Sequence, residues 1–164
     1  MLVACTLGRR FGIVSFSRSL EPWFSEIVAW HGMTGRCAAI RTLDESFQSI
    51  NDVQEEKEAV LIDLALRTVK NDAADVVILA GAPLSGLANK IADRVPVPLV
   101  DGIQAATIMA EGLVRMQPRN AYGYQMLGRA LHGVGRAAEA RTAWQRALQL
   151  DPSDQRTKDL LAAP

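Results

Sequence analysis

Short apolar runs alternate with longer amphipathic stretches through the first two thirds of the chain. The run 75–80, Asp-Val-Val-Ile-Leu-Ala, is nearly continuous in apolar residues, which is typical of a strand buried on both faces of a parallel sheet. Pro96 and Pro98 fall within the last such run and favour a position at the sheet edge. We therefore expect strands at 11–16, 37–40, 75–80 and 96–100, and helices at about 20–31, 52–70, 85–94 and 101–116.

Strands that alternate with helices predict an α/β fold, in which a parallel sheet carries helices on both faces. Right-handed crossovers make a small doubly wound sheet of four strands the simplest arrangement, with strand order 2-1-3-4. Ligands of such sheets bind at the carboxyl ends of the strands, where the winding direction reverses. The sequence therefore predicts a ligand crevice between the first and third strands, lined by residues 15–19 and 81–85.

The amino-acid composition changes near residues 116–120, after which the sequence is rich in alanine, arginine and leucine. The spacing of apolar residues there predicts helices at about 120–133 and 137–150, followed by a short helix from about 152. We expect two domains, an α/β domain over 1–117 and an all-α helical hairpin over 118–164.

The composition excludes several classes of function but does not identify one. Eighteen basic and 18 acidic side chains among 164 residues give a net charge of zero, which offers no electrostatic reason to expect nucleic acid or an anionic membrane as partner. Two cysteines form no disulfide framework and no metal-ligand cluster. No secretory signal is visible, and no apolar stretch approaches the roughly 18 residues of a membrane span, so we expect a soluble, cytoplasmic protein.

Three serines, Ser15, Ser17 and Ser19, crowd the turn after the first predicted strand. Hydroxyls and backbone N–H groups in such a turn can receive a carboxylate or phosphate, or Ser17 or Ser19 can cap the next helix. Residues 81–86, Gly-Ala-Pro-Leu-Ser-Gly, match neither the dinucleotide fingerprint nor the phosphate-loop pattern. This second turn is either a tight turn with Ser85 as a helix cap or a place where backbone approaches a ligand.

The remaining polar candidates fit structural roles. His31 ends a predicted helix, where a cationic ring suits the helix dipole, and His132 lies within the later helical region. Cys5 and Cys37 precede or begin strands, which places them at the edge of the sheet opposite the predicted crevice. A catalytic thiolate would have to lie at the crevice, so we interpret both cysteines as structural.

Four segments, in order and spacing, resemble a known family. They are 7–15 (Leu-Gly-Arg-Arg-Phe-Gly-Ile-Val-Ser), 36–38 (Arg-Cys-Ala), 73–82 (Ala-Ala-Asp-Val-Val-Ile-Leu-Ala-Gly-Ala) and 97–102 (Val-Pro-Leu-Val-Asp-Gly). Together they resemble the second half of the aspartate/glutamate/hydantoin racemase superfamily over about residues 1–117. The resemblance implies two pseudo-symmetric doubly wound halves with the active site between them. It also implies cofactor-independent proton exchange at the α-carbon of an amino acid or hydantoin-like substrate, with one cysteine from each half.

The chain departs from that pattern at both cysteines. The family's first half is absent, and alignment through 87–88 puts Gly81 where the second cysteine is expected, so we assign no catalytic residue. General acid–base groups contribute roughly 10²–10⁴-fold each, and their loss predicts impaired catalysis. The ligand-holding turns keep their places, and the residues expected to bind substrate are Ser15, Phe16, Ser17, Gly81, Ala82, Pro83 and Leu84. Residues 1–6 resemble the interior of a helix that links the two halves, so we expect an N-terminal extension in the reading frame.

The tail resembles a single tetratricopeptide repeat over about residues 119–152. With Pro152 as the closing proline of a 34-residue unit, the signature positions fall on Tyr124, Leu127, Gly128, Leu131, Ala140, Trp144 and Ala147. One repeat cannot bury its own face. We expect it to pack on the α/β domain, on a second copy or on a protein partner.

Three readings of function follow. The first is a racemase-like protein, catalytically impaired, that holds a small carboxylate or hydantoin-like ligand at the two turns. The second is a non-catalytic interaction or ligand-binding module that uses the tetratricopeptide helices, and a relic without a selected role is a third. Because the family's halves are pseudo-symmetric, we also expect that two copies could pair and recreate a cleft lined twice by Ser15, Ser17 and Gly81.

Overall fold

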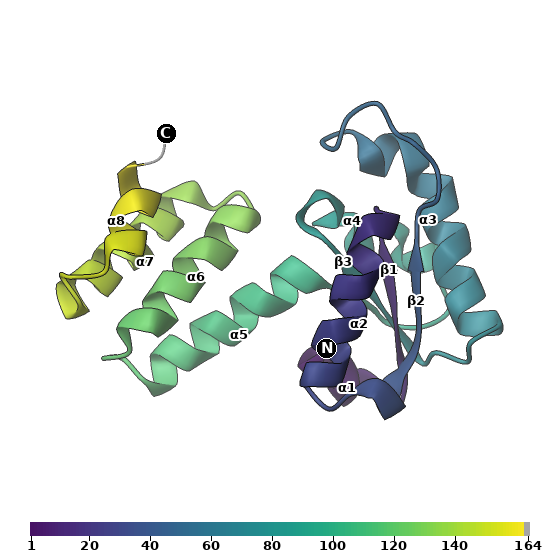
Figure 1. The fold of residues 1–164 in the computed structure, drawn as a ribbon, viewed down its shortest axis with the longest axis horizontal. Coiled ribbons are helices and arrows are strands. Elements are labelled where there is room, and N and C mark those ends of the chain that lie inside the picture. Colours follow the sequence, from purple (N-terminus) through teal and green to yellow (C-terminus); the bar gives the residue numbers. More distant parts are fainter. Residues whose placement is uncertain (163–164) are drawn as a thin grey trace. The chain divides into compact units, whose positions relative to one another are not determined.

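The computed structural model describes residues 1–162, which form two compact units, Met1–Gly102 and a second from Ile103 onward. The first unit alternates strands and helices in the predicted order (Figure 1). Its elements are α1 (Leu2–Leu7), β1 (Phe11–Ser15), α2 (Glu21–Trp30), β2 (Cys37–Thr42), α3 (Val53–Lys70), β3 (Val76–Ala80), α4 (Leu87–Ile91) and β4 (Leu99–Asp101). Short 3₁₀ turns occupy Arg18–Leu20, Thr34–Arg36, Ala82–Leu84 and Ala92–Arg94.

The four strands form one parallel sheet in the order β2-β1-β3-β4, which confirms the predicted doubly wound α/β fold. Ser15 pairs with Thr42 on one side and with Ala80 on the other, so β1, β2 and β3 end at the same level. The proline-flanked β4 pairs with β3 alone and lies at the sheet edge, as expected from Pro96 and Pro98.

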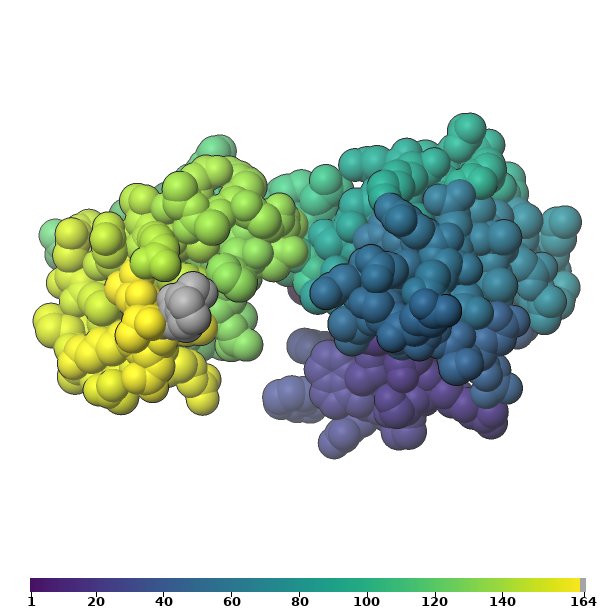
Figure 2. All heavy atoms as spheres, turned by 90° about the horizontal axis from the view of Figure 1, so that it is seen from above, coloured from purple at the N-terminus to yellow at the C-terminus, as the bar shows by residue number. Residues whose placement is uncertain are grey.

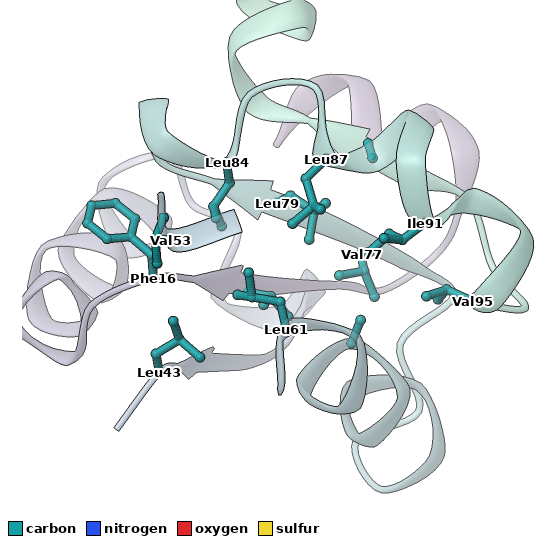
Figure 3. Packing of buried hydrophobic residues seen from close by; sticks show 13 residues of the cluster. Phe16, Leu43, Val53, Leu61, Val77, Leu79, Leu84, Leu87, Ile91 and Val95 are labelled. Carbon is teal, nitrogen blue, oxygen red and sulfur yellow. The ribbon is translucent and has the colours of Figure 1, made fainter. Parts of the chain in front are cut away.

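One face of the sheet packs against α3 and α4 and holds the main core. Successive side chains of a strand point to opposite faces, so Val14, Val77 and Leu79 share this face. They pack with Leu61 of α3 and Leu87 of α4, which are fully buried. Phe16, Leu43, Val53 and Leu84 lie at one end of this cluster and Val95 at the other (Figure 3). Apolar side chains of the core therefore pack directly under the carboxyl edge of the sheet.

The opposite edge is held by polar contacts near the amino ends of the strands. The Asp75 Oδ2 atom accepts hydrogen bonds from the backbone N–H groups of Arg9 and Arg10, each at 3.0 Å. The Arg36 guanidinium donates to the carbonyl of Gly8 at 2.8 Å and to that of Cys5 at 3.2 Å. These bonds tie the end of α1 to the starts of β2 and β3.

The second unit is helical and contains the predicted hairpin. Its helices are α5 (Gly102–Met116), α6 (Ala121–Gly133), α7 (Ala137–Leu150) and α8 (Gln155–Ala162). Asn120 caps α6, because its Oδ1 accepts the Gly123 N–H at 2.8 Å. Gly128 lets α7 approach closely, since a Cβ atom there would lie 2.2 Å from Nε1 of Trp144.

Helix α5 belongs to the helical unit and not to the sheet. Its Ala110 and Val114 pack in one cluster with Leu127 of α6 and Trp144 of α7. The predicted division at 117/118 therefore falls inside the second compact unit, and its end at Pro164 lies outside the described residues. Within residues 1–162, no helix is both long enough and apolar enough to cross a membrane.

Candidate functional site

The loops that follow β1 and β2 line a shallow, open hollow at the carboxyl edge of the sheet. Its volume is about 280 Å³, and its lining combines hydroxyls, charges and two aromatic rings. The lining residues are Phe16, Ser17, Arg18, Ser19, Leu43, Asp44, Glu45, Ser46 and Phe47. Ligands of doubly wound sheets bind at this edge, so the hollow is the candidate site of the first unit.

Arg18 is the cationic group of this hollow. Its Nη1 donates to Asp44 Oδ1 at 2.8 Å, and both side chains are mostly exposed. The hydrogen bond to Asp44 and the charge of that carboxylate raise the pKa of Arg18 above its ordinary value, so the guanidinium stays charged. An exposed ion pair is weak. An incoming carboxylate can therefore compete with Asp44 for the guanidinium at low cost.

Ser17 and Ser19 provide the hydroxyls of the same loop. Their Oγ atoms lie 2.8 Å apart in a mutual hydrogen bond. Neither side chain caps a helix, so the capping alternative for these two serines is wrong. The backbone turns through the 3₁₀ segment Arg18–Leu20 before α2 begins, which leaves both hydroxyls beside the hollow.

Ser15 plays a different part from its two neighbours. Its side chain is fully buried, and its Oγ donates to the Ala80 carbonyl at 2.9 Å. Its own carbonyl accepts the Leu43 N–H at 3.0 Å. Ser15 thus joins the ends of β1, β2 and β3, and the contacts of its hydroxyl are made within the protein.

Helix α3 supports the turn after β3 through hydrogen bonds. Gly81 has a φ of +115°, and its carbonyl accepts the Leu84 N–H at 3.0 Å. Gln54 Nε2 of α3 donates to the carbonyl of Pro83 at 2.7 Å and to that of Ser85 at 2.8 Å. Ser85 does not cap α4, because Gly86 occupies the capping position and no side-chain bond is made there, so that prediction is wrong.

Asp101, at the end of β4, completes the support of this turn. Its Oδ2 accepts the Gly86 N–H at 2.5 Å. Sequence reasoning missed both Gln54 and Asp101 as supports of the turn. Their partners lie far away along the chain, and no local pattern marks a side chain that bonds to distant backbone.

Phe16 separates the two predicted turns. Its ring lies directly over Gly81, because a Cβ atom built on Gly81 would meet Phe16 Cε1 at 2.5 Å. The same ring packs edge-to-face on Phe47, with centroids 6.2 Å apart. The structure thus brings Phe16 and Gly81 together, while the hollow opens between the β1 and β2 loops. Ala82 is exposed in the β3 turn, and Leu84 is buried in the core beneath it.

Both cysteines lie at the other end of the sheet. Cys37 is the first residue of β2, and burial raises the pKa of its thiol above the ordinary value. Cys5 lines a larger hollow of about 740 Å³ at the amino ends of the strands, together with Arg36 and Asp75. Because Arg36 and Asp75 already bond to backbone groups there, we assign the ligand site to the carboxyl edge.

Comparison with known proteins gives one family and a consistent set of relatives. The family model described as Asp/Glu/Hydantoin racemase matches residues 1–110. A hydantoin racemase of Rhizobium meliloti is 27% identical over 112 residues, covering 68% of this chain and 46% of that protein. A hydantoin racemase of Paenarthrobacter aurescens is 29% identical over 117 residues, covering 70% of this chain and 50% of that protein.

Solved structures agree with this grouping. An allantoin racemase from Pseudomonas fluorescens superposes with a TM-score of 0.60 at 28% identity, covering 70% of this chain and 49% of that one. An allantoin racemase from Klebsiella pneumoniae gives a TM-score of 0.64 at 23% identity and supports the fold. The chain spans about half the length of the relatives that it matches.

Proposed function

Because this chain belongs to the Asp/Glu/hydantoin racemase family, we propose that it binds a small carboxylate or hydantoin-like ligand in the hollow between the β1 and β2 loops. We propose further that its own residues do not carry out two-thiol racemisation. The observation that carries both parts is the character of the carboxyl edge. It offers the Arg18 guanidinium and the Ser17 and Ser19 hydroxyls, while both thiols lie elsewhere.

The binding part of the proposal rests on hydrogen-bond donors and on size, since the two carboxylates of the lining, Asp44 and Glu45, are already paired with Arg18 and Lys57. A ligand carboxylate would accept hydrogen bonds from the Arg18 guanidinium, and charge-assisted bonds of this kind are the strong ones. Ser17 and Ser19 each have a rotatable hydroxyl that can turn from its neighbour to a ligand oxygen. A volume of about 280 Å³ suits a ligand of a few heavy atoms and not a long polymer.

The impairment rests on the position expected to carry a thiol. Gly81 has no side chain, and the Phe16 ring fills the space above it. Racemisation needs an acid and a base on opposite faces of the α-carbon, each worth roughly 10²–10⁴-fold. Cys37 cannot take either role at this edge, because it begins β2 at the opposite end of the sheet. Burial also raises the pKa of its thiol, which disfavours the thiolate that the base role needs.

Two measurements on the full chain test the two parts separately. Titration with aspartate, glutamate, 5-substituted hydantoins or allantoin should change the amide NMR chemical shifts of residues 16–19 and 43–47. Absence of shifts there with all four probes would remove the binding part. Deuterium incorporation from solvent at the α-carbon of the same compounds should stay at background, and exchange above background would overturn the impairment.

A second candidate function concerns the helical unit. We propose that α6 and α7 form a tetratricopeptide-like unit that receives a helical segment of a protein partner. A groove of about 500 Å³ supports this proposal, with Leu127 and Leu131 at its floor and Glu111, Glu139 and Arg146 at its rim. Peptides selected against the full chain should lose binding when Thr142, also in the lining, is changed to Glu. Unchanged binding by the Thr142→Glu variant would contradict this proposal.

A further inference from the structure

Helix α2 carries a stripe of exposed apolar side chains that the core does not use. Trp23 is 54% exposed and Trp30 is 84% exposed, and the partly buried Ile27 lies between them. Positions 23, 27 and 30 fall on one face of a helix, at spacings of four and three residues. Val28, which is 3% exposed, marks the different face that packs toward the sheet. The helix lies alongside the strands in Figure 1, and the purple segment that contains it is at the surface of the unit in Figure 2.

Two exposed indoles on one short helix are a costly feature for a surface that stays in water. An indole side chain buries roughly 150–250 Å² when covered, and Trp is enriched where protein surfaces meet. The two rings have intramolecular neighbours. Trp23 packs on Phe24 at 5.1 Å between centroids, and Trp30 packs on His31 at 5.8 Å. Their outer faces remain open, so the stripe is a candidate contact surface.

We propose that this stripe is the contact between two copies of the chain, which pack α2 against α2 in antiparallel fashion about a two-fold axis near Ile27. The spacing of the stripe is the reason for choosing a second copy as the occupant. Trp23 and Trp30 lie almost equally far on either side of Ile27. An antiparallel copy therefore sets Trp23 of one chain against Trp30 of the other, twice. A two-fold contact requires such a self-complementary patch.

The size of the surface agrees with a weak dimer. A helix of ten residues is about 15 Å long, so a second α2 covers the stripe from end to end. Two indoles and Ile27 supply roughly a third of the ~800 Å² per partner of a standard interface, and the side chains beside the stripe add to this.

Two structural consequences distinguish this dimer from other dimers. The helix of a β–α–β unit runs antiparallel to its strands, so antiparallel α2 helices point the carboxyl edges of the two sheets in opposite directions. The two ligand hollows then lie at opposite ends of the dimer and do not form one shared cleft. Glu26 flanks the stripe beside the axis, and the two Glu26 carboxylates approach each other. Glu26→Gln should therefore tighten the dimer.

Sedimentation of the full chain over a range of concentrations tests the contact. The wild-type chain should show a monomer–dimer equilibrium, and Trp30→Lys should raise the dissociation constant by roughly thirtyfold or more. Met116→Lys is the matched control, because Met116 is 80% exposed but lies outside α2, and it should leave the equilibrium unchanged. A strictly monomeric wild-type chain overturns the proposal, and so does a dimer that survives Trp30→Lys.

Cross-linking fixes the geometry and does not depend on the ligand site. In a Cys5→Ser, Cys37→Ser background, Ile27→Cys lies near the two-fold axis and should form a covalent dimer on oxidation with copper–phenanthroline. Ser17→Cys, at the ligand hollow, should not. Cross-linking through Ser17→Cys but not through Ile27→Cys would mean that the hollows face each other, which contradicts the α2 contact. Ligand binding can succeed or fail in either case, so the two proposals are tested independently.

Discussion

Gly81 and Phe16 share one space, because a Cβ atom on Gly81 would lie 2.5 Å from Cε1 and 2.8 Å from Cδ1 of the Phe16 ring. The contact is closer than any real Cβ atom makes, so a side chain at position 81 requires the ring to move. The φ of +115° at Gly81 adds a second obstacle, since L side chains rarely adopt it. The position expected to hold a thiol is thus built for a glycine.

We predict that Gly81→Cys destabilises the first unit and does not restore racemisation. Backbone strain of roughly 1–3 kcal/mol and overpacking of roughly 1–3 kcal/mol should together lower the free energy of unfolding by about 2–6 kcal/mol. Urea denaturation measures this loss. Gly86→Ala is the control, since Gly86 also has a positive φ of +87° but no described residue other than its chain neighbours lies within 4 Å of its Cβ position. That variant should lose only about 1–2 kcal/mol.

A double-mutant cycle separates the ring contact from the backbone strain. Phe16→Ala removes the clash, so Gly81→Cys should cost about 1–3 kcal/mol less in a Phe16→Ala background than in the wild-type chain. Additive costs would show that the ring and the glycine are not coupled. That result would contradict the shared space described above.

Ligand binding at the carboxyl edge should depend on Arg18. Replacing it by Ala removes the cation that faces the hollow, and we expect affinity for whichever carboxylate probe binds to fall roughly tenfold or more. Stability should hardly change, because the Arg18–Asp44 pair is mostly exposed. Arg67→Ala is the matched control, because Arg67 forms an exposed ion pair with Asp63 on α3, away from the hollow. Equal affinities of the two variants, measured by calorimetry, would argue against the site.

Much of the fold follows from short-range patterns. The apolar run that ends at Ala80 marks β3, and the two prolines before β4 predict its edge position. Strand order follows from alternating elements and from the handedness of crossovers, neither of which needs side-chain detail. Helices α6 and α7 begin and end within a residue of the predicted bounds. Asn120 caps the start of α6, and a glycine follows the end of that helix.

The candidate site follows from the sequence only in outline. The loop Ser15–Ser19 lies at the predicted edge, but the hollow opens toward Asp44 and Glu45, which no motif marks. The direction of the Phe16 ring decides this, and a ring's rotamer depends on packing among Phe47, Leu43 and Leu84. The grouping of α5 with the tail likewise depends on which apolar faces meet, and not on where its sequence texture changes.

The helical unit should tolerate a larger residue at one glycine and not at another. Gly128→Ala places a methyl group 2.2 Å from Trp144 Nε1 and should destabilise the helical unit by about 1–3 kcal/mol. Gly112→Ala in α5 is the matched control, since among the described residues nothing beyond the adjoining backbone of its own helix lies within 4 Å of its Cβ position. Removal of a helical glycine there should stabilise by about 0.5–1 kcal/mol. Opposite signs of the two effects in thermal unfolding are the expected result, and a stabilising Gly128→Ala would contradict the close approach of α6 and α7.

Acid should weaken the helical unit through Asp154. Its carboxylate accepts hydrogen bonds from the hydroxyl of Thr157 at 2.5 Å and from Gln125 Nε2 at 2.7 Å. These bonds, the Thr157 hydroxyl first, lower the pKa of Asp154 below its usual range. A carboxylate whose pKa is lower in the folded chain stabilises it at pH values above the unfolded pKa of about 3.9. That contribution is lost as the pH falls through the folded pKa.

Hydrogen exchange at the Trp144 indole reports on this contribution, because its Nε1 donates to the Gln125 carbonyl at 3.2 Å inside the same network. In the Asp154→Asn variant the Trp144 indole should exchange faster than in the wild-type chain at pH 7. The difference between the two exchange rates should shrink as the pH approaches 3. Asp159→Asn is the matched control, since within residues 1–162 that exposed carboxylate accepts from Gln155 of its own helix alone, and it should leave the pH dependence unchanged. A difference between Asp154→Asn and wild type that stays constant from pH 7 to pH 3 would mean that the charge of Asp154 does not stabilise the unit.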